Sequence, residues 1–238
     1  MKSLIYTLML LFSGIFLCAQ ETAPAEEATD TLNLLSLIQQ GGWAMYPLGT
    51  CSVIMLFLIF YSWKETTTKK FFVREQVDES LSAFEEGNAQ RGLSCLEATD
   101  VLLNRAVTPA LKKIHKGPEK SENLFIENLE AEENNVAQWV TYLNVVASVA
   151  PMIGLLGTVS GMISAFQTIG RGGMGRPELL AGDIGEALIT TATGLVIGIP
   201  AMIAYFVLRN RLNSAMIATA QAGTELIEVA LNKVDVNS

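Results

Sequence analysis

One acidic residue, Glu186, stands at the edge of a long uncharged stretch, where a carboxylate is costly to keep. No charged residue occurs from Ala187 to Leu208, and a bilayer takes about 20 such residues to cross. A charged side chain costs about 2.5–3.5 kcal/mol near the bilayer centre, so an acid at the lip of a membrane helix marks a route for an ion or a proton. We therefore predict that Glu186 takes part in such a route.

Hydroxyl side chains gather near this acid in sequence. Three threonines follow it and a fourth lies in an earlier uncharged stretch: Thr190, Thr191 and Thr193, and Thr158. A threonine in lipid commonly donates its hydroxyl to its own helix backbone, so each one taken alone has a structural interpretation. Together with an acid, the same hydroxyls could instead line a wet path.

Helix geometry limits how these groups can cooperate. On an ideal helix Glu186 and Thr190 share a face, whereas Thr191 lies about 140° away from Glu186. If Glu186 and Thr191 serve one pathway, the helix must begin irregularly near Gly185, or Thr191 must face the channel while Glu186 addresses a neighbouring subunit. The residues alone leave both alternatives open.

Small residues recur in both uncharged stretches at helical spacing. Gly157 and Gly161 form one GxxxG pair, and Gly194 and Gly198 form another. In lipid, such small residues let helix backbones approach closely. We predict that the glycines pack one helix against another: Gly154, Gly157, Gly161, Gly194 and Gly198.

Other kinds of site find no support in the sequence. Cys18, Cys51 and Cys95 lie in dissimilar surroundings, which predicts neither a disulfide framework nor a metal site. The single histidine, His115, lies among lysines and suits a solvated helix end. No nucleophile and base can be paired, and we expect no enzymatic activity, no cofactor and no metal. The net charge of −8, without a basic stripe, argues against nucleic acid as a partner.

The composition and the apolar runs predict an all-α membrane protein. Half of the 238 residues are hydrophobic although the chain is acidic, so apolar and charged parts must be segregated. Three transmembrane helices are expected at 43–63, 139–169 and 184–208. Trp43 and Trp63 stand at the two ends of the first, where interfacial aromatic rings prefer to lie.

Residues 1–19 have the pattern of a signal peptide, with a lysine, an apolar run and a small residue before a polar segment. A lipoprotein signal at Cys18 is an alternative, disfavoured by the bulky Leu17 before it. A fourth, uncleaved span is another alternative, although the apolar run is short. Residues 20–42 form an acidic tail, expected in the periplasm, and the stretch from Glu21 to Asp30 has no apolar period.

Lysine and arginine residues predict the orientation. Ten of them lie between Lys64 and Gln138, and three more follow the last span, against two in the loop at 170–183. The positive-inside rule then puts this loop and the mature N-terminus in the periplasm and the C-terminus in the cytoplasm.

The charged region 64–138 is expected to be helical and cytoplasmic, with breaks near Gly87, Pro109 and Gly117. No glycine or proline occurs from Ser121 to Ala150, which predicts a helix from Ser121 to about Phe166.

Such a helix would be about 70 Å long and would project well beyond the bilayer. Residues 209–238 are predicted to continue the last span as a cytoplasmic C-terminal helix. The fold class is thus three transmembrane helices, the second and third extended into the cytoplasm, with a small helical cytoplasmic segment.

Two long strings resemble the motifs of a known family. Residues 150–163, APMIGLLGTVSGMI, and residues 185–201, GEALITTATGLVIGIPA, are similar to the second-span and third-span motifs of the MotA/TolQ/ExbB proton channel family. Residues 40–140 match that family only in pattern. The resemblance implies that Thr158, Glu186 and Thr191 line or flank a proton pore.

The resemblance also implies a homopentamer in the bacterial inner membrane. Its ring would enclose the single helices of ExbD- or TolR-like partners, whose intramembrane aspartate carries the proton, and a TonB-like protein spanning the periplasm is a possible further partner. Three spans and a signal peptide fit the ExbB or TolQ branch better than the MotA branch. An ExbB-like role in biopolymer transport is favoured, with TolQ-like envelope maintenance second and a non-conducting membrane scaffold as the remaining alternative.

Overall fold

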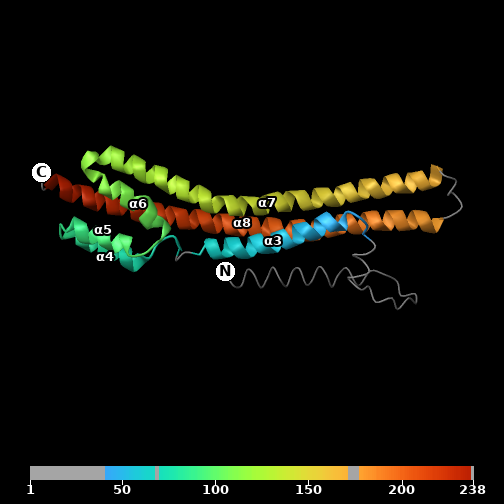
Figure 1. Cartoon of the computed structure of the whole chain (residues 1–238), viewed down its shortest axis with the longest axis horizontal. Helices are drawn as coiled ribbons and strands as arrows, with labels where there is room; N and C mark the ends of the chain where they lie inside the picture. The colour runs from blue at the N-terminus through green and yellow to red at the C-terminus, as the bar shows by residue number, and fades with distance from the viewer. Residues whose placement is uncertain (1–40, 68–69, 171–176, 237–238) are drawn as a thin grey trace. The chain divides into compact units, whose positions relative to one another are not determined.

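The computed structural model describes residues 41–67, 70–170 and 177–236, and all regular elements in these ranges are helical. They are α3 (Met45–Glu65), α4 (Arg74–Glu85), α5 (Ala89–Glu97), α6 (Leu102–Lys112), the 3-10 turn η2 (Ile114–Lys116), α7 (Pro118–Gly170) and α8 (Pro177–Val236) (Figure 1). The all-α class is confirmed. The signal peptide at 1–19 and nearly all of the acidic tail at 20–42 lie outside the described residues.

Two very long helices form the backbone of the fold. α7 has 53 residues and α8 has 60, which gives lengths of about 80 and 90 Å, against about 30 Å for the hydrocarbon of a bilayer. They run antiparallel and pack along much of their length (Figure 1). The prediction of a single helix over Ser121–Phe166, continuing beyond the membrane, is confirmed.

The ends of these helices follow local signals. Gly117 has a φ of +108°, which a residue with a side chain rarely adopts, and Pro118 then opens α7. Pro177 opens α8, because its fixed φ suits the first helical position. The helix therefore begins within the loop expected at 170–183, and before the start at 184 that the apolar run suggested.

The break expected near Pro109 is wrong. Pro109 lies inside α6, which continues to Lys112. The missing N–H costs one helical hydrogen bond, but α6 buries Val107, Ala110 and Leu111 completely or nearly so, and this burial keeps the helix intact. The break near Gly87, where φ is +81°, is confirmed.

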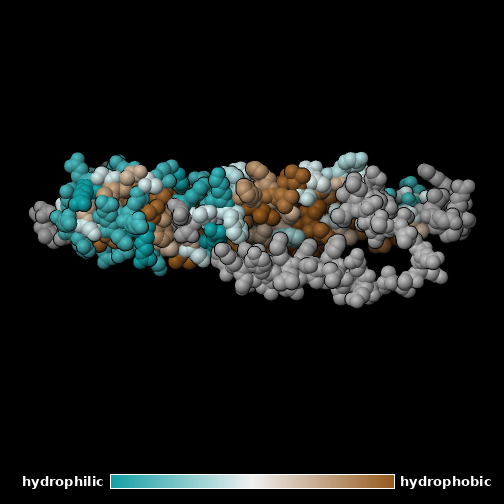
Figure 2. All heavy atoms as spheres, turned by 90° about the horizontal axis from the view of Figure 1, so that it is seen from below, coloured by the Kyte–Doolittle hydropathy of each residue, from teal (hydrophilic) through white to brown (hydrophobic). Residues whose placement is uncertain are grey.

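Within the ranges that the structure describes, three helices are long and apolar enough to cross a membrane, namely Met45–Glu65 and the apolar parts of α7 and α8. Large apolar side chains are exposed on all three, with Phe60 79% and Leu155 61% exposed. Figure 2 shows these hydrophobic residues gathered over the middle of the described helices and hydrophilic residues over the part that contains α4 and α5. An apolar outer surface of this kind suits lipid.

Among the described residues, three buried clusters hold α7 and α8 together, and the two larger ones lie at different depths. In the membrane part, α3 packs on both through Leu48, Met55, Leu58, Leu143, Ala150, Ala201 and Leu208. Outside it, α4, α5 and α6 pack on both through Val77, Phe84, Leu96, Leu103, Val107, Phe125, Leu226 and Ile227. The two long helices are therefore held together by α3 in the membrane part and by the small subdomain of α4, α5 and α6 outside it.

Each long helix contains one proline within its membrane part, Pro151 in α7 and Pro200 in α8. The ring of Pro151 lies against Gly198, where a Cβ would be 2.6 Å from its Cγ. The carbonyl of Ala147, which the proline deprives of its helical donor, faces the same glycine. The two prolines therefore lie at nearly the same depth.

Candidate functional site

A row of glycines brings the backbones of α7 and α8 into direct contact. A Cβ on Gly154 would lie 3.0 Å from the carbonyl oxygen of Thr190, and a Cβ on Gly194 would lie 2.7 Å from that of Ala150. A Cβ on Gly161 would lie 2.7 Å from the Cβ of Ala187. Cβ atoms essentially never come within 3.0 Å of such neighbours, so Gly194 and Gly161 have no room for a side chain, and at Gly154 the backbone of α8 would have to give way.

The other two glycines singled out from the sequence lie in the same contact. A Cβ on Gly157 would overlap the side chain of Thr190, and one on Gly198 would meet the ring of Pro151. All five glycines therefore face the opposite long helix, and we call this contact the glycine seam. Backbones this close gain dispersion and Cα–H contacts that larger residues would prevent.

Three threonine hydroxyls lie in or beside the glycine seam, and each donates to a backbone carbonyl. Thr191 Oγ1 donates across the seam to the carbonyl of Gly154 at 3.0 Å. Thr158 and Thr190 donate within their own helices, at 2.7 and 2.8 Å, and Thr190 is 1% exposed. A hydroxyl that donates in this way still offers oxygen lone pairs, so Thr158 and Thr191 can accept a hydrogen bond from water.

Glu186 faces the segment that leads into α3. Its carboxylate lies against Gly42, whose φ is +58°, and a Cβ at Gly42 would overlap the carboxylate oxygen. The next residue, Trp43, donates its indole N–H to Ser160 Oγ on α7 at 3.2 Å. Residues 42–43 thus bind to both long helices at the depth where α3 begins, and they hold Glu186 at that end of the span.

Glu186 and Thr191 lie on opposite sides of the glycine seam. α8 is continuous through Gly185, so the irregular start considered from the sequence does not occur. Ala187 faces α7 at Gly161. Seen along the axis of α8, Glu186 lies about 100° from Ala187 in one direction, and Thr191 lies about 40° from Ala187 in the other direction. Within one subunit the structure brings Thr191 close to α7 and Glu186 close to the start of α3, but it does not bring the two together.

Thr158 belongs with Thr191 rather than with Glu186. It lies one helical turn beyond Gly154, the residue whose carbonyl accepts the hydroxyl of Thr191, and residues four apart share a helix face. The arrangement can therefore do two separate things. Glu186 can take up and release a proton at the end of the span, and the Thr158–Thr191 side can hold water by hydrogen bonding.

Sequence reasoning missed two neighbours of Glu186. Asp183, one turn before Glu186, accepts a weak hydrogen bond from Thr168 Oγ1 at 3.5 Å. The loop expected at 170–183 contains Asp183, although its spacing of three from Glu186 is a usable signal. Gly42 was also missed, although two consecutive glycines before a tryptophan indicate a turn. Over the ranges that the structure describes, no three potential ligands cluster as a metal site would require.

Replacing Gly42 with alanine should loosen the segment that covers Glu186. The new side chain would disfavour φ of +58° by about 1–2 kcal/mol and would collide with the carboxylate. We expect amide hydrogen exchange over residues 41–47 to rise about 5- to 30-fold, measured on the full chain in its assembly. Gly49→Ala is the matched control, because a Cβ at Gly49 meets nothing within 4 Å. Equal exchange in both variants would contradict the contact.

Comparison with known proteins identifies the group to which these features belong. Residues 97–221 match the model of the MotA/TolQ/ExbB proton channel family. The chain is 30% identical to an ExbB-like biopolymer transport protein of Synechocystis sp., over 89% of this chain and 85% of the relative. It is 28% identical to the biopolymer transport protein ExbB of Xanthomonas campestris, over 83% and 79%. It is 36% identical to the Tol-Pal system protein TolQ of Haemophilus influenzae, over 57% and 62%.

Proposed function

Because the chain belongs to the MotA/TolQ/ExbB proton channel family, we propose that it is a subunit of a proton channel in the bacterial inner membrane that couples the proton motive force to work across the periplasm. The observation that carries this proposal is the acid at the end of the span. Glu186 is held where α3 begins, beside a glycine seam flanked by Thr158 and Thr191. On one side of the seam the carboxylate can take up a proton, and on the other side the hydroxyls of Thr158 and Thr191 can hydrogen-bond water.

The rest of the route is supplied by another chain. No charged residue occurs in this sequence from Ala187 to Leu208 or from Asn134 to Gly170, so the uncharged parts of α7 and α8 contain no second acid to carry a proton onward. The partner in our proposal is an ExbD- or TolR-like protein with one span and an intramembrane aspartate. A homopentamer of this chain encloses that span, and Glu186 and Thr191, on opposite sides of the seam, then face different neighbours.

The orientation follows the positive-inside rule. The mature N-terminus and the short loop between α7 and α8 are periplasmic, and the region 64–138 and the C-terminal part of α8 are cytoplasmic. In this orientation Glu186 faces the periplasmic side, from which protons enter. The signal peptide at 1–19 delivers the N-terminus to that side.

We favour an ExbB-like role in energised biopolymer transport. The two ExbB relatives match 89% and 83% of this chain, whereas the TolQ relative matches 57%. TolQ-like envelope maintenance is the second candidate, supported by the 36% identity to the TolQ relative within its matched region.

The proposal predicts a proton flux that requires both proteins. In vesicles under a membrane potential, the chain together with its copurifying single-span partner should admit protons, and the chain alone should not. Thr191→Val should lower the proton flux at least about tenfold. The change removes a hydroxyl from the Thr158–Thr191 side of the seam, and a tenfold loss corresponds to about 1.4 kcal/mol in the barrier to proton transfer. Thr193→Val is the matched control, because Thr193 bonds only to Ile189 in its own helix.

The readout is a pH-sensitive dye inside the vesicles. Vesicles that hold both proteins and remain proton-tight under voltage would end the proton-channel proposal. Proton flux that is equal in the Thr191→Val and Thr193→Val variants would remove Thr191 from the route.

A further inference from the structure

A small polar pocket lies at the end of α3 opposite to Glu186. Its volume is about 280 Å³, and it is lined by Tyr61 and Glu65 of α3, Arg105 of α6, and Glu132, Asn135, Val136 and Trp139 of α7. The proposed proton route uses none of these residues. Three helices from separate parts of the chain build the pocket, so it is a feature of the fold rather than of one loop.

The pocket lies at the depth of the lipid headgroups. α3 ends at Glu65, directly after the basic Lys64, and on α7 the last charged residue before the uncharged stretch is Glu133. Tyrosine and tryptophan, here Tyr61 and Trp139, are the residues that prefer the membrane–water interface. Lipid headgroups are therefore present at high local concentration at the pocket mouth.

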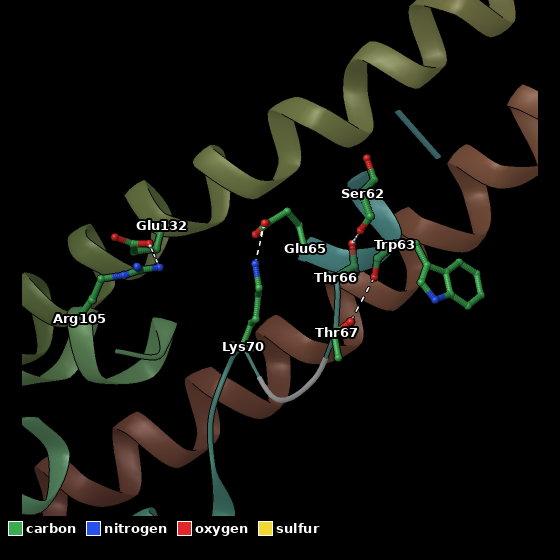
Figure 3. A network of polar contacts seen from close by, with 8 residues as sticks. All are labelled: Ser62, Trp63, Glu65, Thr66, Thr67, Lys70, Arg105 and Glu132. Atoms are coloured by element: carbon green, nitrogen blue, oxygen red, sulfur yellow. Dashed lines mark hydrogen bonds and ion pairs between the residues drawn. The ribbon is translucent and has the colours of Figure 1, made fainter. Parts of the chain in front are cut away.

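The charged wall of the pocket contains both signs. Arg105 Nη2 pairs with Glu132 at 2.9 Å, and Lys70 Nζ pairs with Glu65 at 2.6 Å (Figure 3). The two carboxylates are partly buried, with 22% and 25% of their side chains exposed, whereas Arg105 is 49% exposed. A purely anionic ligand would meet two carboxylates, and a purely cationic ligand would meet the guanidinium, so the wall favours a ligand that carries both charges.

The other wall is aromatic. The rings of Tyr61 and Trp139, which line the pocket together with Glu65, lie 4.6 Å apart between centroids at 53°. An ammonium group is attracted both by aromatic rings and by a carboxylate. The same pairing of a cation with an aromatic ring occurs nearby, where the Arg211 guanidinium lies 5.2 Å from the ring centre of Trp63.

We propose that this pocket binds the headgroup of a phospholipid with a primary ammonium group, phosphatidylethanolamine in chemical terms. The ammonium lies between Glu65 and the rings of Tyr61 and Trp139, and the phosphate accepts hydrogen bonds from Arg105 and from the exposed Asn135 amide. Pockets for drug-sized ligands measure about 300–1,000 Å³, so a pocket just below that range suits a headgroup. The acyl chains then lie in the membrane along the apolar outer face of α3.

Native mass spectrometry of the full-length protein in its assembly tests this proposal. The assembly is released from nanodiscs that contain phosphatidylethanolamine and phosphatidylglycerol in equal amounts, and the retained lipids are counted. We expect phosphatidylethanolamine to be retained at least about threefold over phosphatidylglycerol. Glu65→Gln and Trp139→Leu should each lower its retention about three- to tenfold, as the loss of one cation–carboxylate or cation–π contact predicts.

Matched variants separate the site from general lipid contact. Glu130→Gln removes an exposed carboxylate of α7 outside the pocket, and Phe166→Leu removes an aromatic side chain that is 65% exposed far from it. Both should retain lipid as the unmodified chain does, with assembly mass and melting temperature as the check on folding. If one pocket variant fails to assemble, the proposal is still tested by the lipid preference of the unmodified chain and by lipid retention in the other pocket variant.

Three results would overturn the proposal. Phosphatidylglycerol could be retained as well as phosphatidylethanolamine, or the two pocket variants could retain lipid as the controls do. Alternatively, free phosphoethanolamine, added to the detergent-solubilised protein, could bind as well as the lipid does, which would make the ligand a soluble molecule. None of these results depends on whether the protein conducts protons, so the proposed function is tested separately.

Discussion

Glu186→Ala is expected to abolish energised transport while the assembly survives. The carboxylate can exchange a proton at the end of the span, and alanine cannot. General acid–base groups contribute about 100- to 10,000-fold to the rate of proton transfer, so we expect at least about a 100-fold loss of proton flux. Little structural damage should accompany it, because Glu186 is half-buried and lies against Gly42 rather than in the glycine seam. Proton flux in vesicles and transport in cells are the measurements.

Two further variants sharpen this experiment. Glu186→Gln keeps the shape of the side chain but cannot exchange a proton as a carboxylate does, so this variant should lose proton flux as Glu186→Ala does. Asp183→Asn removes the neighbouring carboxylate, which contacts Thr168 on α7, and should keep at least about half of the flux, a change of less than about 0.5 kcal/mol in the barrier. If transport by the Glu186→Ala variant were normal, the acid would have no role in the pathway. That result would favour the alternative that the protein is a non-conducting membrane scaffold.

Gly157→Leu is expected to cause the largest loss of stability. A Cβ at this position would overlap Thr190, so a leucine must push α7 and α8 apart and break the hydrogen bond from Thr191 to the Gly154 carbonyl. Overpacking costs about 1–3 kcal/mol when side chains can adjust. Here a Cβ at Gly157 would lie 2.7 Å from the Cβ of Thr190, which no change of rotamer can move, so we expect about 3 kcal/mol or more. In a chain of this size this lowers the melting temperature by about 6–12 °C.

The matched control lies in the same pair of helices. A Cβ at Gly182 meets nothing within 4 Å, so Gly182→Leu should leave the melting temperature of the solubilised assembly within about 2 °C of the unmodified value, as surface substitutions do. Similar melting temperatures for Gly157→Leu and Gly182→Leu would contradict the close approach at the seam. A pure scaffold would be sensitive to Gly157→Leu and indifferent to Glu186→Ala, so the two experiments together separate it from a channel.

Much of the fold was predictable because its signals are local. Uncharged runs of more than 20 residues indicate membrane helices wherever they occur, and Gly117 followed by Pro118 marks a helix start by backbone preference alone. The break expected at Pro109 failed for the opposite reason. A proline inside a helix has a local cost, and only the tertiary burial of Val107 and Ala110 shows that the cost is outweighed.

The candidate site was predictable only in its residue types. Spacing placed Glu186 and Thr191 on different faces, and the regular course of α8 keeps them there. The neighbours of each could not be inferred, because Gly42 lies far from Glu186 in sequence and no periodic pattern connects them. The same is true of the carbonyl of Gly154, which Thr191 finds only after two antiparallel helices have come together. The roles of Thr158, Glu186 and Thr191 in conduction stay predictions.

The paired prolines weaken the backbone hydrogen bonding of both long helices at nearly the same depth. Pro151 rests on Gly198, two residues before Pro200, so each helix lacks one backbone hydrogen bond at almost the same height. Both helices should therefore bend more easily at this depth than elsewhere along their length. One half of the pair packs against α4, α5 and α6, and the other half, which carries Glu186, packs against α3 and residues 42–43. Bending at the prolines would therefore move Glu186 together with the start of α3.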